Sequence, residues 1–164
     1  MDVGSDQALP DTSALAQLSY ELSLRTLTQQ ESSLNELRAR TGTLIAAASI
    51  VTSFLGGAAI ARHGLDVWSA LALVAFVASI ALATWVLLPK RNLVFSVFGS
   101  ALFEDAVEAD IFEIGETHRR LAYWLDGYHA ENEPKVSGLF VFYRWATAAM
   151  LVEVVFWSLQ LALS

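Results

Sequence analysis

The stretch TLIAAASIVTSFLGGAAIA-RHGLD-VWSALALVAFVASIALATWVLL, residues 43–88, decides the fold of this chain. It contains two uncharged apolar runs of 19 and 22 residues, joined by a polar turn of five residues. An α-helix rises about 1.5 Å per residue, so roughly 20 apolar residues cross the hydrocarbon core of a membrane. A helix also satisfies its own backbone hydrogen bonds where no water is present. The stretch therefore predicts a hairpin of two transmembrane helices.

A third apolar run, WATAAMLVEVVFWSLQLAL (145–163), carries one charge, at Glu153. We therefore expect an all-α integral membrane protein with three transmembrane helices and two cytoplasmic amphipathic helical segments. The expected segments are a disordered N-terminus (1–13), a cytoplasmic amphipathic helix (14–41), transmembrane helix 1 (42–61), an external turn (62–66), transmembrane helix 2 (67–89), a cytoplasmic acidic helical segment (90–138) and transmembrane helix 3 (139–163).

The composition agrees with a membrane protein. The hydrophobic fraction is 55% and the charged fraction 16%, against roughly 45–50% and about 25% in soluble domains. The net charge of −7 and the absence of a basic stripe argue against nucleic acid as a partner. The chain has no cysteine, which excludes disulfides, thiol catalysis and cysteine-based zinc sites. We expect no cofactor and no metal.

Two segments outside the spans have helical periodicity. In 14–41, leucines recur at helical spacing, and Thr28 with Glu31 would fit a capping box that breaks the helix. In 90–138, an acidic face opposes an apolar stripe, and Asn132, Glu133 and Pro134 are expected to end the helix. The leucines of 14–41 either pack on this second segment or form a self-associating coiled coil.

The placement of Lys and Arg predicts the orientation. Nine of the ten lie on the side of the two expected cytoplasmic segments, and Arg62 alone lies in the turn. This predicts an inner-membrane protein with a cytoplasmic N-terminus and an external C-terminus. The expected interface anchors, which are basic or tryptophan side chains near the ends of the spans, are Arg38, Arg40, Trp68, Trp85, Lys90, Arg91 and Arg144.

Small residues recur every fourth position along the first span, at Ser49, Ser53, Gly57 and Ala61. Such a series lets another helix backbone approach closely. The second span has its own small residues at Ala75, Ser79 and Ala83. The series therefore serves either packing within the hairpin or packing between subunits.

Glu153 is the principal candidate site, since an ionisable residue within a span is costly and faces the protein interior or an ion path. By depth, its candidate partners are Ser49, Thr52, Ser53 and Ser79. One interpretation is a neutral, hydrogen-bonded acid that fixes the fold, because burial raises a carboxyl pKa. The other is a role in conduction, gating or subunit assembly.

The remaining polar residues do not form a catalytic arrangement. His118 lies on an apolar stripe, where a packed histidine is more common than a ligand. Asp126, His129 and Glu133 share a helical face, but this combination is a weak metal signal. Without a catalytic triad, a phosphate-binding loop or a pair of catalytic acids, we expect no enzyme.

The layout of a cytoplasmic helix, the basic corner LRARTG (37–42), a short-turn hairpin and a second cytoplasmic helix resembles two families. These are the SLATT-type two-transmembrane effectors and the Pycsar transmembrane effectors of bacterial nucleotide-signalling defence. The segments LRARTGTLIAAASIVTSFLGG (37–57) and ENEPKVSGLFVFYRWATAAMLVEVVFWSLQLAL (131–163) are also similar to a family of uncharacterised bacterial three-span proteins. The resemblance implies assembly in the membrane and disruption of it on activation.

The expected function is that of a non-enzymatic membrane protein that self-assembles in the lipid bilayer, as a pore-forming or membrane-disrupting effector of antiphage defence. One alternative is a structural or regulatory subunit that presents its cytoplasmic helices to a protein partner. A small ion transporter or channel subunit is the third.

Overall fold

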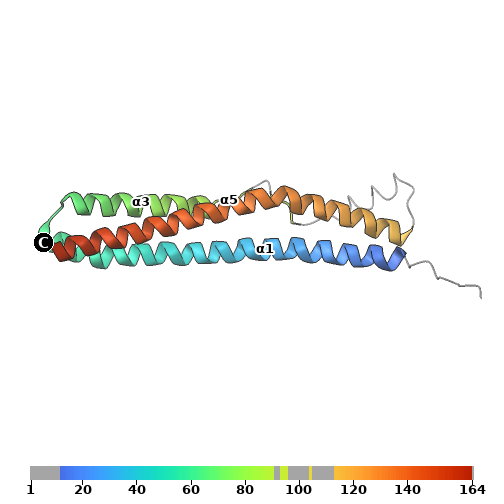
Figure 1. Ribbon diagram of the computed structural model, residues 1–164, viewed down its shortest axis with the longest axis horizontal. Coiled ribbons are helices and arrows are strands. Elements are labelled where there is room, and N and C mark those ends of the chain that lie inside the picture. Colours follow the sequence, from blue (N-terminus) through green and yellow to red (C-terminus); the bar gives the residue numbers. More distant parts are fainter. Residues whose placement is uncertain (1–11, 91–92, 96–103, 105–112, 164) are drawn as a thin grey trace, which may run out of the picture. The chain divides into compact units, whose positions relative to one another are not determined.

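The computed structural model describes residues 12–90, 93–95, 104 and 113–163, and every element in these ranges is helical (Figure 1). Helix α1 (Thr12–Val51) continues through the π-helical turn η1 (Thr52–Gly56) into α2 (Gly57–His63). Helices α3 (Val67–Leu87) and α5 (Ile114–Leu163) follow. Within the described ranges three helices are long and apolar enough to cross a membrane, so the expected all-helical fold class is confirmed. The disordered N-terminus was expected over residues 1–13, and residues 1–11 of it lie outside the described ranges.

Helix α1 is a single uninterrupted helix of 40 residues that contains both the first amphipathic segment and the start of the first span. The expected break near Thr28 is wrong. The hydroxyl of Thr28 donates to the carbonyl of Leu24, at 2.8 Å, within the helix. A threonine inside a helix often makes this bond to the preceding turn instead of capping a new helix.

Helix α5 runs for 50 residues and includes Pro134, so the expected helix end at 132–134 is wrong. Proline removes the N–H that would bond the carbonyl of Ala130, which costs about 3 kcal/mol. Buried Leu125, Val136 and Leu139 lie on both sides of it and anchor the helix. Asn132 does not cap the helix. Its side chain donates to the carbonyl of Val94 at 2.6 Å and accepts from the N–H of Val94 at 3.3 Å.

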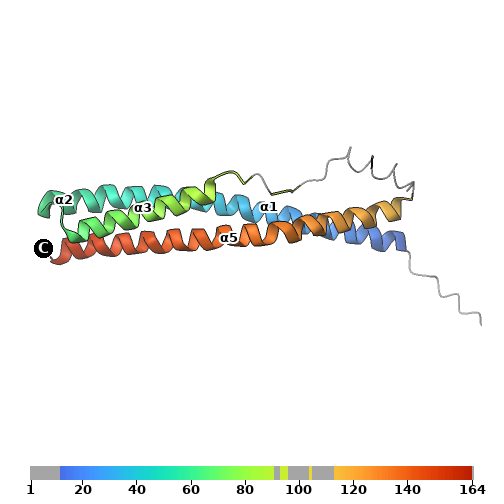
Figure 2. The same ribbon diagram turned by 90° about the horizontal axis from the view of Figure 1, so that it is seen from above.

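The chain divides into two compact units, residues 1–31 with 94–132 and residues 32–93 with 133–164. The second, the span unit, packs α3 against the later parts of α1 and α5 (Figures 1 and 2). One cluster joins Leu44, Ala83 and Ala146. Another joins Ala59, Ala72 and Trp157. Since residue numbers rise from the first cluster to the second in α1 and α5 and fall in α3, α3 runs antiparallel to the other two helices.

Buried positions follow a repeat of seven residues. On α1 they alternate at intervals of four and three, at Ser23, Leu27, Gln30, Leu34, Leu37, Thr41, Leu44 and Ala48. On α5 they recur every seventh residue, at Leu125, Asn132, Leu139, Ala146, Glu153 and Gln160. This spacing is typical of helices that pack along a coiled-coil seam.

The span unit is apolar outside and partly polar inside. Exposed side chains include Phe54, Val74 and Leu151, of which Phe54 is 73% exposed. Ser69, Ser79, Glu153 and Gln160 are buried. Large apolar surfaces are rarely left in water, whereas lipid accepts them and makes interhelical packing depend on small and polar residues. The surface of this unit therefore fits a bilayer.

The first unit pairs the early parts of α1 and α5. The ring of Tyr20 stacks on His118 with centroids 5.4 Å apart, and the amide of Gln30 donates to the carbonyl of His129 at 3.3 Å. Leu27 is fully buried. Leu15, Leu18 and Leu22 are instead 54%, 52% and 54% exposed, so one apolar face of α1 remains open among the described residues.

Candidate functional site

Glu153 lies in the interior of the span unit with no exposed surface. The hydroxyl of Thr52, on η1, donates a short hydrogen bond to Glu153 Oε1. The indole N–H of Trp157, one turn further along α5, is a second donor close to this carboxyl group. Neither Glu153 Oε2 nor Trp157 Nε1 has a hydrogen bond of regular geometry, and both atoms are buried. The carboxyl group is therefore only half satisfied by its described surroundings.

The π-helical turn brings Thr52 to this carboxyl group. A π-turn inserts one extra residue into an α-helix, so it shifts the helix face that follows. The seven-residue repeat of α1 continued from Leu44 and Ala48 would bury Leu55, but the structure buries Gly56 and Ala59 instead. The shift therefore turns Thr52 toward α5 and presents a glycine one turn later.

Gly56 allows the indole of Trp157 to pack against the helix backbone. A Cβ atom on Gly56 would lie 2.8 Å from Trp157 Cζ2 and 3.1 Å from two further ring atoms. Carbon atoms in ordinary contact are about 3.5–4.0 Å apart. Trp157 is fully buried, so it has no open side to move to. The site thus consists of Thr52, Gly56, Glu153 and Trp157 around one π-turn.

The other three hydroxyls that the sequence suggested do not reach Glu153. Ser49 donates to the carbonyl of Ile45 at 2.8 Å, and Ser53 donates to the carbonyl of Ser49 at 2.8 Å. Ser79 donates across the helix interface to the carbonyl of Ala146 at 2.9 Å. Of the four candidates, the structure joins Thr52 to the acid.

A second polar cluster, which the sequence analysis missed, lies at the turn between α2 and α3. Gln160 Nε2 donates to the carbonyl of Gly64 at 3.2 Å, and Ser69 Oγ donates to Gln160 Oε1 at 2.9 Å. Asp66 caps α3 by accepting from the N–H of Ser69 at 2.9 Å. Gln160 follows Glu153 by seven residues, so the repeat itself was the available signal.

The small-residue series of the first span faces outward. Ser49, Ser53, Gly57 and Ala61 are all exposed, so the alternative in which this series packs against the second span within the chain is wrong. The contacts inside the span unit use the other side of the helix, where Ala59 meets Ala72. The small residues of the second span, Ala75, Ser79 and Ala83, are buried.

No protein family, curated protein or solved structure matches the chain. The geometry of the two units is therefore what bears on function.

The expected interface anchors have different surroundings. Trp68 contacts Phe156 of α5 with ring centroids 6.1 Å apart, and Trp85 contacts Phe142 of α5 with ring centroids 6.2 Å apart. Arg40 pairs with Glu36 at 2.5 Å, both well exposed, which contributes little to stability. Lys90 holds its ammonium group 4.2 Å from the centre of the Trp85 ring. Arg38 is half-buried, Arg144 is exposed and Arg91 lies outside the described residues.

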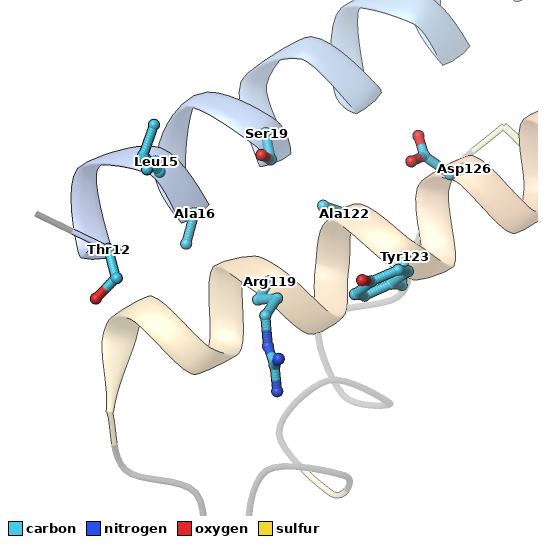
Figure 3. Close-up of a pocket in the computed structure, with 8 residues that line it drawn as sticks. All are labelled: Thr12, Leu15, Ala16, Ser19, Arg119, Ala122, Tyr123 and Asp126. Atoms are coloured by element: carbon cyan, nitrogen blue, oxygen red, sulfur yellow. The ribbon is translucent and has the colours of Figure 1, made fainter. Parts of the chain in front are cut away.

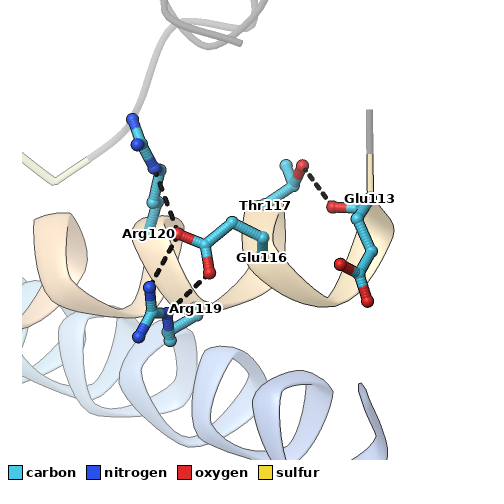
Figure 4. Close-up of polar contacts among 5 residues, drawn as sticks. All are labelled: Glu113, Glu116, Thr117, Arg119 and Arg120. Atoms are coloured by element: carbon cyan, nitrogen blue, oxygen red, sulfur yellow. Dashed lines mark hydrogen bonds and ion pairs between the residues drawn. The ribbon is translucent and has the colours of Figure 1, made fainter. Parts of the chain in front are cut away.

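The first unit holds an ion-pair cluster at the start of α5, around the half-buried Glu116 (Figure 4). Glu116 accepts from Arg119 at 2.8 Å and from Arg120 at 3.4 Å. The hydrogen bond from Arg119 lowers the pKa of Glu116 from its ordinary value, against a smaller opposing effect of burial. The hydroxyl of Thr117 donates to the carbonyl of Glu113 and closes the first turn.

A groove of about 410 Å³ opens beside this cluster, between the start of α1 and α5 (Figure 3). Its wall carries Arg119 and Asp126, opposite in charge, next to Tyr123. Among the residues that the structure describes, no group of His, Cys, Asp or Glu side chains is arranged to hold a metal ion. Asp126, His129 and Glu133 therefore do not form such a group.

Proposed function

We propose that this chain is a non-enzymatic multi-pass membrane protein that assembles with copies of itself in the bilayer. The observation that carries the proposal is the outward position of Ser49, Ser53, Gly57 and Ala61. A Cβ atom on Gly57 would meet nothing within 4 Å, so the helix backbone is open there. In lipid, helices associate largely through van der Waals packing, and small residues strengthen this packing because they let the backbones approach closely.

The span unit supports one arrangement of the chain in a membrane. Its helices alternate in direction, so the chain enters and leaves a bilayer on opposite sides. With the first unit on the cytoplasmic side, nine of the ten basic residues lie inside, as the positive-inside rule requires. This distribution of basic residues supports the proposal of an inner-membrane protein with a cytoplasmic N-terminus and an external C-terminus.

Cross-linking tests the assembly directly, because the chain has no cysteine of its own. Ser53→Cys is expected to form disulfide-linked dimers in liposomes under oxidation. Val74→Cys, on the outer face of α3, is the control and is expected to cross-link much more slowly. Adding Gly57→Leu to Ser53→Cys is expected to abolish the dimer, whereas Ala58→Leu is not. Equal cross-linking at positions 53 and 74 would exclude this interface.

The resemblance to SLATT-type and Pycsar effectors supports a more specific role for the assembly, namely permeabilisation of the membrane during antiphage defence. The test is expression in cells loaded with a membrane-potential dye and challenged with phage. We expect depolarisation that Gly57→Leu prevents and Ala58→Leu does not. If infected cells show no depolarisation and the protein is a monomer on native gels, the effector role is excluded.

One observation favours a second function, that of a subunit which binds a protein partner. Leu15, Leu18 and Leu22 form an exposed apolar face on the first unit. A stoichiometric heterologous partner that co-purifies with the chain and is lost on Leu18→Asp would favour this function over self-assembly.

A third function, ion transport, has support from Glu153 alone. It is the one ionisable residue among the fully buried side chains that the structure describes. In that case Glu153→Gln abolishes proton-coupled flux in liposomes and leaves the Ser53→Cys cross-link intact.

A further inference from the structure

A second cavity, of about 460 Å³, lies within the span unit where α3 ends and the third span begins. We refer to it as the α3-end pocket. Ligand pockets in proteins commonly have volumes of 300–1,000 Å³. Eight residues line it, and those that bear on binding are Trp85, Lys90, Lys135, Gly138 and Phe142.

The charged part of the wall is entirely basic. Lys90 and Lys135 line the pocket and no carboxylate does so among the described residues. The ammonium group of Lys90 is held over the Trp85 ring at 4.2 Å, and a cation–π contact of this kind orients the charge. Lys135 also interacts with another group of the chain, so Lys90 is the principal cation of the pocket.

The apolar part of the wall is continuous with the outer surface of the span unit. Trp85 and Phe142 contact each other and are 50% and 37% exposed. Tryptophan at the end of a span favours the level of the lipid headgroups. The pocket therefore presents two cations at headgroup level above a surface suited to an acyl chain.

We propose that the α3-end pocket binds an anionic phospholipid, with the phosphate group at Lys90 and Lys135 and an acyl chain along Trp85 and Phe142. Basic pockets between transmembrane helices on the cytoplasmic side bind acidic headgroups in this way. The proposal does not depend on self-assembly, because all eight lining residues belong to one copy of the chain.

A purely structural role for Lys90 accounts for less of the geometry. A cation just after the end of a helix stabilises the helix dipole, and Lys90 follows α3 by three residues. That role needs neither a second lysine on α5 nor a cavity between the two helices. Both features are expected of a binding site.

Native mass spectrometry of the full chain in a neutral detergent tests the proposal. Phosphatidylglycerol and phosphatidylcholine with the same acyl chains are titrated separately, and inorganic phosphate is added as a competitor. We expect phosphatidylglycerol to bind more tightly than phosphatidylcholine. Lys90→Gln is expected to weaken phosphatidylglycerol binding about fivefold, the effect of one basic residue near an anionic surface, and Lys90→Arg to restore it.

Two further variants separate the pocket from general charge and from folding. Arg62→Gln removes one positive charge from the other end of the hairpin and should leave binding unchanged. Gly138→Leu fills the pocket without altering charge, since a Cβ atom there meets nothing within 4 Å, and it should reduce binding. Equal affinity for the two lipids or an equal loss with Arg62→Gln would overturn the proposal. Displacement of phosphatidylglycerol by an equimolar amount of inorganic phosphate would also overturn it, because the acyl chain would then add nothing to binding.

Discussion

Gly56→Ala tests the packing of the π-turn against the third span. The added Cβ atom would lie 2.8 Å from Trp157 Cζ2, which is about 0.7 Å closer than an ordinary contact of about 3.5 Å. Trp157 is fully buried, so the ring or the helix has to shift. Overpacking of this kind costs about 1–3 kcal/mol.

The matched control is Gly42→Ala, in the same helical rod, where a Cβ atom meets nothing within 4 Å. Both substitutions gain about 1 kcal/mol of helix propensity, so this gain cancels in the comparison. We expect the free energy of unfolding of Gly56→Ala to lie about 1–3 kcal/mol below that of Gly42→Ala. Reversible unfolding in mixed micelles of increasing SDS content, followed by circular dichroism, measures the difference.

A double-mutant cycle links the loss to the tryptophan. Trp157→Leu removes the ring atoms that the new methyl group would meet, so Gly56→Ala should cost far less in that background. Equal stability of Gly56→Ala and Gly42→Ala would refute the packing, as would a loss that is unchanged by Trp157→Leu.

Three other predictions follow from single contacts. Thr52→Val removes the hydrogen bond to Glu153 and should lower the free energy of unfolding by about 1 kcal/mol, whereas Thr52→Ser keeps the hydroxyl and should not. Equal free energies of unfolding of the two variants in the SDS titration would contradict the contact. Gln160→Leu removes the hydrogen bonds to the Ser69 hydroxyl and to the Gly64 carbonyl. It should lower the free energy of unfolding by about 1 kcal/mol, measured in the same way, and an unchanged value would show that these bonds are dispensable. In a carbon-13 NMR titration, the pKa of Glu116 should lie below its ordinary value and rise in Arg119→Gln. A pKa that is lower in the folded than in the unfolded state stabilises the fold at pH values above the unfolded-state pKa, and this stabilisation is lost as the pH falls through the folded-state pKa. An identical titration of Glu116 in Arg119→Gln would rule out the pairing.

The helical architecture could be predicted because uncharged runs of this length leave few other structures available. The path of α5 through Pro134 could not. The expectation that the helix ends at proline takes into account the missing hydrogen bond, about 3 kcal/mol. It does not take into account that Leu125, Val136 and Leu139 are buried on the two sides of Pro134. Burial of one such side chain contributes about 1.5–3 kcal/mol, so three of them outweigh the proline.

The site was only partly predictable, for a similar reason. Charge and position singled out Glu153, and depth in the membrane suggested four hydroxyl partners. The choice of Thr52 depends on the π-turn, because Ser49 and Ser53 bond their own helix instead. A search for apolar periodicity also overlooks Gln160, since a polar residue occupies a position where the repeat normally places a leucine.

Helix α1 is longer than the hydrocarbon core of a membrane is thick. Its 40 residues extend for about 60 Å at 1.5 Å per residue, twice the thickness of a hydrocarbon core of about 30 Å. Only residues 43–51 of α1 belong to the first uncharged apolar run, and η1 and α2 continue that run to Ala61. A hydrocarbon core that surrounds this run is too thin to cover the rest of α1 as well.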